Sequence, residues 1–221
     1  MPHSWRQPAE QINLFLDHQR TRVAGITSPL RGSGVSTLAA RLSAARAASG
    51  VKTLLLDLNG SGPDGSKICW SPADPATFLP ARSNDGYDVV VGCSGQRSLF
   101  NNVATLRQTF GVQLAGYEQI IVDLPALSAT DTINPAAVAA ACDGVLIVCV
   151  TGRSSAAVLR AAIAKLDAAG ASVSGTVLND AETPPLSQQV TRSLYRVEPY
   201  LPRLTNWAAR KLQANEFLSR P

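Results

Sequence analysis

The sequence contains few of the residues on which triad hydrolases and zinc sites depend. Only two of its 221 residues are histidines, His3 and His18, and both lie near the N-terminus. A Ser-His-Asp triad therefore has no base in the body of the chain, and no G-x-S-x-G elbow occurs. The four cysteines show no C-x-x-C spacing, which argues against a zinc site and indicates reduced thiols.

Long apolar runs are also missing. A membrane-spanning helix needs ~20 apolar residues, and runs such as 145–150 are far shorter. No basic segment followed by an apolar stretch opens the chain, so we expect no cleaved signal peptide and a cytoplasmic location. Hydrophobic residues make up 45% of the chain and charged residues 16%, which provides a core and excludes disorder along the whole length.

The net charge of +4 is concentrated at the C-terminal end. Residues 192–221 carry six basic residues against two acidic ones, so the rest of the chain is neutral. Such a segment can contact acidic lipid headgroups, an acidic protein or nucleic acid, or form a solvated helix face. Aromatic residues do not alternate with the basic ones as in a nucleic-acid stacking platform, and we expect no nucleic-acid partner.

Short apolar runs alternate with Ala-rich stretches through most of the chain. The runs are continuous, which is typical of strands buried on both faces of a parallel sheet. We therefore expect an α/β fold, a doubly wound and mostly parallel sheet flanked by helices. The expected strands are 22–27, 53–57, 88–92, 119–123, 144–150 and 172–178, and the expected helices are 9–18, 36–49, 99–110, 135–142 and 154–169.

Two regions break this alternation. Residues 59–85 are rich in Gly, Ser, Pro and Asp, which predicts a long surface loop. Near the end of the chain, Pro184 and Pro185 close the sheet region. We expect a single domain over residues 1–183 with its N-terminal helix, and a basic C-terminal arm over 184–221 that contains a last helix.

A Gly/Ser-rich segment lies between the first expected strand and the helix that follows it. It reads Gly32-Ser33-Gly34-Val35-Ser36-Thr37. The backbone N–H groups of such a loop, together with the helix dipole, bind phosphate groups. These six residues are therefore the candidate site for the phosphates of ATP or ADP. The P-loop pattern has Gly-Lys-Ser/Thr here, and Val35 occupies the lysine position.

The missing lysine changes the chemistry that we expect from this loop. Valine carries no charge, and the loss of one preorganised donor costs ~3 kcal/mol or more of transition-state stabilisation. Arg31, Arg41 or Arg153 could supply a substitute charge. Three interpretations stay open: a loop that binds no nucleotide, nucleotide binding without efficient turnover, and a working ATPase or kinase.

Two apolar runs end in an aspartate, Asp57 and Asp123, where the ligands of open parallel sheets bind. If the chain is active, these two are the candidate catalytic residues. If a nucleotide binds, Ser36 and Asp123 are the candidate ligands of Mg²⁺, as in P-loop proteins. Either aspartate can instead cap the segment that follows it.

These segments together resemble the P-loop family that includes MinD/ParA-type ATPases and, more closely, the bacterial tyrosine kinases (BY-kinases) of capsule and exopolysaccharide export. Thr27-Ser28 and residues 32–37 resemble the Walker A stretch T-S-x-x-x-G-E-G-K-S-T of these kinases. Residues 55–59 resemble their Walker A′ motif L-I-D-x-D, and residues 120–126 their Walker B motif. The resemblance covers roughly residues 9–180. It implies a P-loop NTPase-like fold and places Asn179 where related ATPases read the adenine edge.

The chain departs from the family pattern at the positions that bind phosphate, carry a carboxylate, form the ring or accept phosphate. Val35 replaces the Walker A lysine, and Asn59 replaces the second Walker A′ carboxylate. The oligomerisation motif E-x-x-R-x-x-R maps to Glu10, Asn13 and Leu16, so both arginines are missing and we expect no ring through this motif. The C-terminal tyrosine cluster of these kinases is also missing. Together the departures predict a pseudokinase rather than an enzyme.

The resemblance implies a regulatory or scaffold protein of exopolysaccharide or capsule biosynthesis and export, without efficient ATP hydrolysis or tyrosine kinase activity. Its expected partner is an inner-membrane chain-length or polymerisation protein, with peripheral membrane contact through the basic arm. One alternative is a nucleotide-binding or active ATPase of the MinD/ParA type, although Leu30 stands at the signature-lysine position of these proteins. Another is a Rossmann-type NAD-binding protein, in which Gly32 and Gly34 form G-x-G and Thr37 replaces the third glycine.

Overall fold

The strands of the chain form one sheet in the computed structural model, which describes residues 6–59, 70–92, 99–129 and 133–180. Within these residues the strand order is β3-β4-β2-β5-β1-β6-β7, and every neighbouring pair is parallel except β3 with β4. The strands are β1 (Val23–Thr27), β2 (Thr53–Asp57), β3 (Ala81–Arg82), β4 (Asp88–Val91), β5 (Gln119–Asp123), β6 (Gly144–Val150) and β7 (Val173–Asn179). The predicted α/β fold with a mostly parallel sheet is confirmed.

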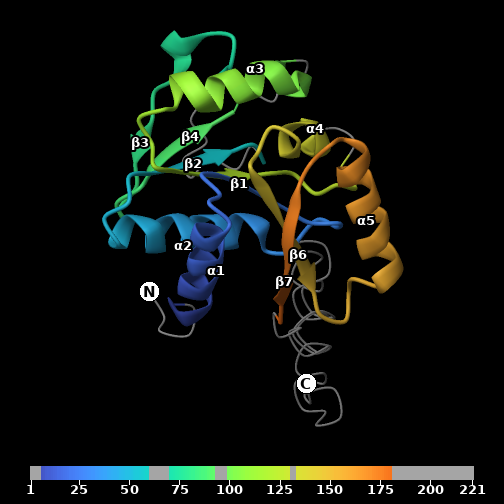
Figure 1. Cartoon of the computed structure of the whole chain (residues 1–221). Coiled ribbons are helices and arrows are strands. Elements are labelled where there is room, and N and C mark those ends of the chain that lie inside the picture. The colour runs from blue at the N-terminus through green and yellow to red at the C-terminus, as the bar shows by residue number, and fades with distance from the viewer. Residues whose placement is uncertain (1–5, 60–69, 93–98, 130–132, 181–221) are drawn as a thin grey trace, which may run out of the picture. The chain divides into compact units, whose positions relative to one another are not determined.

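Helices cover both faces of this sheet (Figure 1). Alternate strand residues point to opposite faces, so Leu55 packs in one core cluster, while Leu54 and Leu56 pack in the other. The first cluster lies under α1 (Arg6–His18) and α2 (Val35–Ala48). The second lies under α3 (Val103–Gln108), α4 (Pro135–Ala139) and α5 (Ala156–Ala168). Burial on both faces explains why the strand sequences are continuously apolar.

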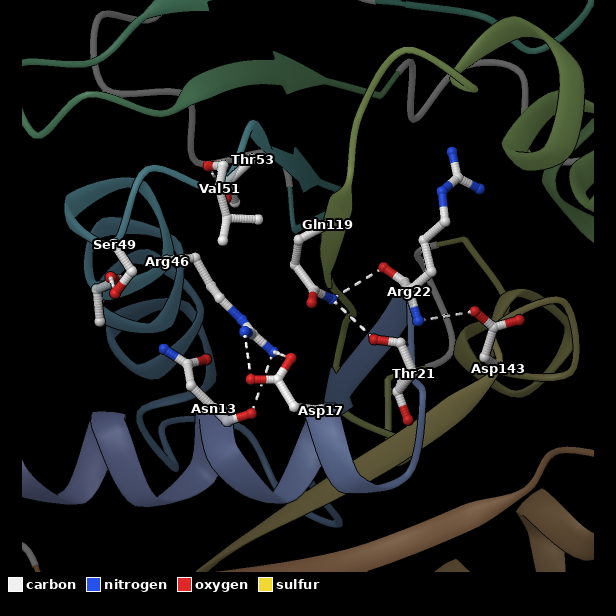
Figure 2. Close-up of polar contacts among 11 residues, drawn as sticks. Asn13, Asp17, Thr21, Arg22, Arg46, Ser49, Val51, Thr53, Gln119 and Asp143 are labelled. Atoms are coloured by element: carbon white, nitrogen blue, oxygen red, sulfur yellow. Dashed lines mark hydrogen bonds and ion pairs between the residues drawn. The ribbon is translucent and has the colours of Figure 1, made fainter.

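A buried arginine joins α1 to α2 (Figure 2). Arg46 of α2 is only 6% exposed, and its guanidinium reaches Asp17 of α1 with N–O distances of 2.7 and 2.8 Å. The same guanidinium donates to the backbone carbonyl oxygen of Asn13 at 3.1 Å. The guanidinium is buried whereas the Asp17 side chain is 58% exposed, and both partners of the guanidinium belong to α1. These contacts hold α1 against α2, the helix that begins at the phosphate loop.

Two expected segments differ from the structure. The expected helix 99–110 is divided into a 3₁₀ turn (Leu99–Asn101), α3 and a π-helical turn (Thr109–Gln113). The division follows from Asn102, whose side chain accepts a hydrogen bond from the N–H of Thr105 and so starts a new helix. The described part of the expected loop 59–85 contains a 3₁₀ turn (Pro75–Thr77) and the antiparallel strand β3.

The other expected elements agree with the structure to within a few residues, and three strands match at both ends. Within the described residues, no helix has both the length and the apolar character that crossing a bilayer requires. The described cysteines, Cys142 and Cys149, are free and buried. The boundary at 183/184 and the basic C-terminal arm with its last helix lie outside the described residues.

Candidate functional site

The candidate site lies at the edge of the sheet where parallel strands β1, β2 and β5 end. The sheet register pairs Ile26 of β1 with Asp123 of β5, and pairs Asp57 of β2 with the same Asp123. The loop after β1 therefore lies beside both aspartates. This is the position at which open α/β sheets bind ligands.

Two glycines with positive φ shape the phosphate loop between β1 and α2. Gly32 has φ 74° and Gly34 has φ 86°, a left-handed conformation that other residues adopt at a cost. Gly34 is the N-cap of α2, and no side chain caps the helix. The hydroxyl groups of Ser28 and Ser33 both donate to the carbonyl oxygen of Leu30, at 2.8 and 2.7 Å, and so close the loop on itself.

A pocket of about 380 Å³ lies against this loop. Its walls come from the loop, from Asn59 just after β2 and from the segment after β5. The lining residues are Ser28, Arg31, Gly32, Ser33, Gly34, Val35, Ser36, Thr37, Asn59, Leu124, Pro125, Ala126 and Ala129. All six predicted phosphate-loop residues line this pocket, whereas Asp57, Asp123 and Asn179 lie beside it.

Val35 is the first residue of α2 and is only 7% exposed. Its side chain belongs to the core cluster that contains Ile26 and Leu38, although it also lines the pocket. An apolar group thus takes part in the core where a P-loop lysine would extend toward phosphate oxygens. Val35 provides the pocket with neither charge nor a side-chain donor.

Asn59 joins the strand ends to the phosphate loop. Its amide nitrogen Nδ2 lies 2.7 Å from Asp123 Oδ1, 3.2 Å from the carbonyl oxygen of Leu124 and 3.4 Å from Ser36 Oγ. Its backbone N–H donates to Asp57 Oδ1 at 2.8 Å. The two predicted Mg²⁺ ligands, Ser36 and Asp123, are therefore close together, with an amide group between them.

Asp123 is a buried carboxyl group with 3% of its surface exposed. The pKa of Asp123 is raised to about 7, chiefly by burial; the neighbouring Asp57 carboxylate also raises it, and hydrogen bonds from Ser36 and Asn59 lower it. The group is therefore partly protonated near neutral pH. A carboxyl group in this state is a weaker cation ligand than a fully ionised one.

The three arginines proposed as substitute charges lie in different places. Arg31 lines the phosphate pocket. Arg153, in the turn after β6, has Nη1 3.5 Å from the carbonyl oxygen of Gly32. Arg41 lines instead a groove between α1 and α2 together with Asp17 and Arg46. Two of the three candidates thus adjoin the phosphate loop.

Asn179 at the end of β7 contacts the backbone of the phosphate loop. Its Nδ2 donates to the carbonyl oxygen of Ser33 at 3.0 Å. A Cβ atom at Gly34 would lie 2.6 Å from the same nitrogen. The contact with the loop backbone was not predicted, because the resemblance assigned Asn179 to the base of a nucleotide. The role of Asn59 as a hydrogen-bond donor was also not predicted, because the family pattern showed Asn59 only as the replacement of a carboxylate.

The strand order differs from that of a Rossmann fold. In the Rossmann order the first two strands are adjacent, whereas here β5 lies between β1 and β2. Among the described residues, no three His, Cys, Asp or Glu side chains are grouped so that they could hold a metal ion.

Solved structures of kinase domains and of P-loop ATPases have the same fold. The kinase domain of the Escherichia coli tyrosine kinase ETK matches with a TM-score of 0.66 and 20% identity, over 79% of this chain and 74% of that domain. The VpsO kinase domain matches with a TM-score of 0.64 and 22% identity, over 79% of this chain and 93% of that domain. The cell division protein MinD of Aquifex aeolicus matches with a TM-score of 0.56 and 20% identity, over 78% and 73%.

No protein-family model and no curated protein sequence matches the chain. The structural matches confirm the predicted fold, that of BY-kinase domains and MinD-type ATPases. At these identities they establish the fold alone.

A comparison of two glycines tests the contact between Asn179 and the loop. Gly34 and Gly50 have nearly the same φ, 86° and 82°, but a Cβ atom at Gly50 would meet nothing within 4 Å. We expect Gly34→Ala to lower the free energy of unfolding by ~1 kcal/mol more than Gly50→Ala, because it also displaces the Asn179 hydrogen bond. Chemical denaturation measures both values. In an Asn179→Ala background the two substitutions should cost the same, and an equal cost in the wild type would contradict this account.

The raised pKa of Asp123 predicts a pH-dependent stability. Between pH ~4 and ~7 the folded chain keeps a proton on Asp123 that the unfolded chain has lost, so this contribution to stability disappears as the pH rises through 7. Relative to Asp123→Asn, which cannot titrate, the wild type should lose ~2–3 kcal/mol of unfolding free energy from pH 5 to pH 8. Denaturant unfolding of both proteins across this range measures the difference. A difference that stays constant with pH would show that Asp123 titrates normally.

Proposed function

We propose that the chain is a degenerate BY-kinase-like protein that acts as a regulatory or scaffold component of exopolysaccharide or capsule biosynthesis and export. It does not hydrolyse ATP efficiently and does not phosphorylate tyrosine. The observation that carries this proposal is Val35, a valine at the lysine position of a correctly shaped phosphate loop, packed into the core.

Chemical reasons support an inactive site. The P-loop lysine and the Mg²⁺ ion neutralise the charge that builds on the transferred phosphoryl group. Here Val35 carries no charge, and the oxygens of Ser36 and Asp123 are engaged by the Asn59 amide. Losing one preorganised donor alone costs ~3 kcal/mol or more, and two losses at the same phosphate cost more.

The first helix supports the expectation that no ring forms through the family motif. The positions of its two arginines are occupied here by Asn13 and Leu16, which are 7% and 0% exposed and face inward. Leu16 packs in the core under α1 and α2, and the carbonyl oxygen of Asn13 accepts from Arg46. Neither residue offers a cation to a neighbouring subunit.

The fold and the charge distribution support a site of action beside the inner membrane. Solved structures with this fold include tyrosine kinase domains. The resemblance to BY-kinases implies a membrane partner that controls chain length or polymerisation. The excess of basic residues over 192–221 would favour an anionic lipid surface by up to ~1 kcal/mol per charge. We infer a cytoplasmic protein with peripheral membrane contact.

A nucleotide-binding protein of the MinD/ParA type is the second candidate. Arg31 and Arg153 are the observations in its favour, because both adjoin the phosphate loop and could offset phosphate charge. Both side chains are exposed, so their charges would be screened by water and would support binding of a nucleotide better than its turnover, which needs a preorganised charge.

Turnover assays test the inactive state. We expect the wild-type chain with Mg²⁺ and ATP to release phosphate, and to label tyrosine, no faster than Asp123→Asn, because the lysine and the metal ligands are not available. Radiolabelled ATP hydrolysis and phosphotyrosine detection measure the two activities, with the ETK kinase domain as the active control. Turnover in the wild type that disappears in Asp123→Asn would refute the pseudokinase proposal and favour the second candidate.

A further inference from the structure

The amide nitrogen of Asn59 lies among three oxygen atoms of the site. Its three contacts, Asp123 Oδ1, the carbonyl oxygen of Leu124 and Ser36 Oγ, are all oxygen acceptors. The carbonyl oxygen of Leu124 can only accept a hydrogen bond, so this contact fixes the nitrogen end of the amide toward the site. Ser36 also hydrogen-bonds Asp123 directly.

The same two side-chain oxygens have a defined role in P-loop proteins. There the hydroxyl group after the lysine position and the carboxylate at the end of the Walker B strand hold Mg²⁺. In this chain an NH₂ group with two polar hydrogens lies between Ser36 and Asp123. This group donates hydrogen bonds to the oxygen atoms that a cation would otherwise bind.

The backbone holds Asn59 in this position. Its N–H donates to Asp57 Oδ1, and Asp57 is the register partner of Asp123 on the adjacent strand. The amide is therefore held near Asp123 by its contact with the end of β2. A carboxyl group at residue 59 would be held at the same place, beside Asp57 and Asp123, and would complete a cluster of three carboxylates.

We propose that the Asn59 carboxamide takes the place of the divalent cation and excludes it from the phosphate-loop pocket. Mg²⁺ prefers several oxygen ligands, with one or two carboxylates among them. Asn59 supplies hydrogens toward this point instead of an oxygen, so the residue that decides whether a metal binds here is Asn59. Whatever the pocket accepts, it accepts without a divalent cation.

Metal titration of the full chain tests this inference in the absence of nucleotide. Mn²⁺ is the probe, because its free concentration is read by electron paramagnetic resonance. We expect Asn59→Asp to bind one Mn²⁺, and the wild type to bind Mn²⁺ at least tenfold more weakly. Asn102→Asp is the matched control: it makes the same change at a helix N-cap, where aspartate caps as well as asparagine, and it should behave as the wild type.

Two further variants make the result specific. Asn59→Asp combined with Asp123→Asn should lose the gained site, because one of its carboxylates is gone. Asn59→Ala, which removes the amide without adding charge, should bind Mn²⁺ at least threefold more tightly than the wild type, and it serves if Asn59→Asp does not fold. A wild type that binds one Mn²⁺ as tightly as Asn59→Asp would overturn the inference, as would two folded Asn59 variants with no gain. Because no nucleotide is present, either result is independent of the turnover assays.

Discussion

A buried carboxyl group at the end of β5 sets the requirements for the rest of the site. Asp123 is almost fully enclosed and its register partner is Asp57, so its charge must be shared with donors or suppressed by a proton. In an active P-loop protein a divalent cation meets this need. In this chain Asn59 and Ser36 donate hydrogen bonds to Asp123, and its raised pKa lets a proton neutralise part of the remaining charge. The edge of the sheet is thus satisfied without a metal.

The fold, and the loss of phosphate chemistry that we propose, depend on different parts of the sequence. The sheet depends on continuous apolar runs such as β6, and the loop shape depends on Gly32 and Gly34. Both are present, which explains the match to kinase domains at TM-scores of 0.64 and 0.66 despite identities of 20 to 22%. The chemistry depends on single side chains, and Val35 and Asn59 replace the two that carry charge. The regulatory or scaffold role that we propose needs the fold but not these two charges.

Periodicity and strand ends made most of the fold predictable. The parallel arrangement follows from continuous apolar strands. The position of Asp57 and Asp123 at the edge of the sheet where the phosphate loop lies follows from their places at strand ends. Features that depend on a single side-chain contact, on a very short strand or on residues far apart in sequence were not predictable. The interruption before α3 depends on a side-chain cap by Asn102, and strand β3 is only two residues long. The bond from Asn179 to Ser33 joins residues far apart in sequence, so no local pattern signals it.

Calorimetry of ATP binding with and without Mg²⁺ tests the central claim most directly, on the wild type and on a chain that combines Val35→Lys with Asn59→Asp. We propose that the pocket is intact, that valine at position 35 removes the positive charge that would contact the phosphates, and that asparagine at position 59 removes the metal site. The double variant should therefore bind ATP at least tenfold more tightly than the wild type, and only its binding should strengthen when Mg²⁺ is added. Wild-type binding of ATP that strengthens with Mg²⁺ as much as that of the double variant would contradict the account.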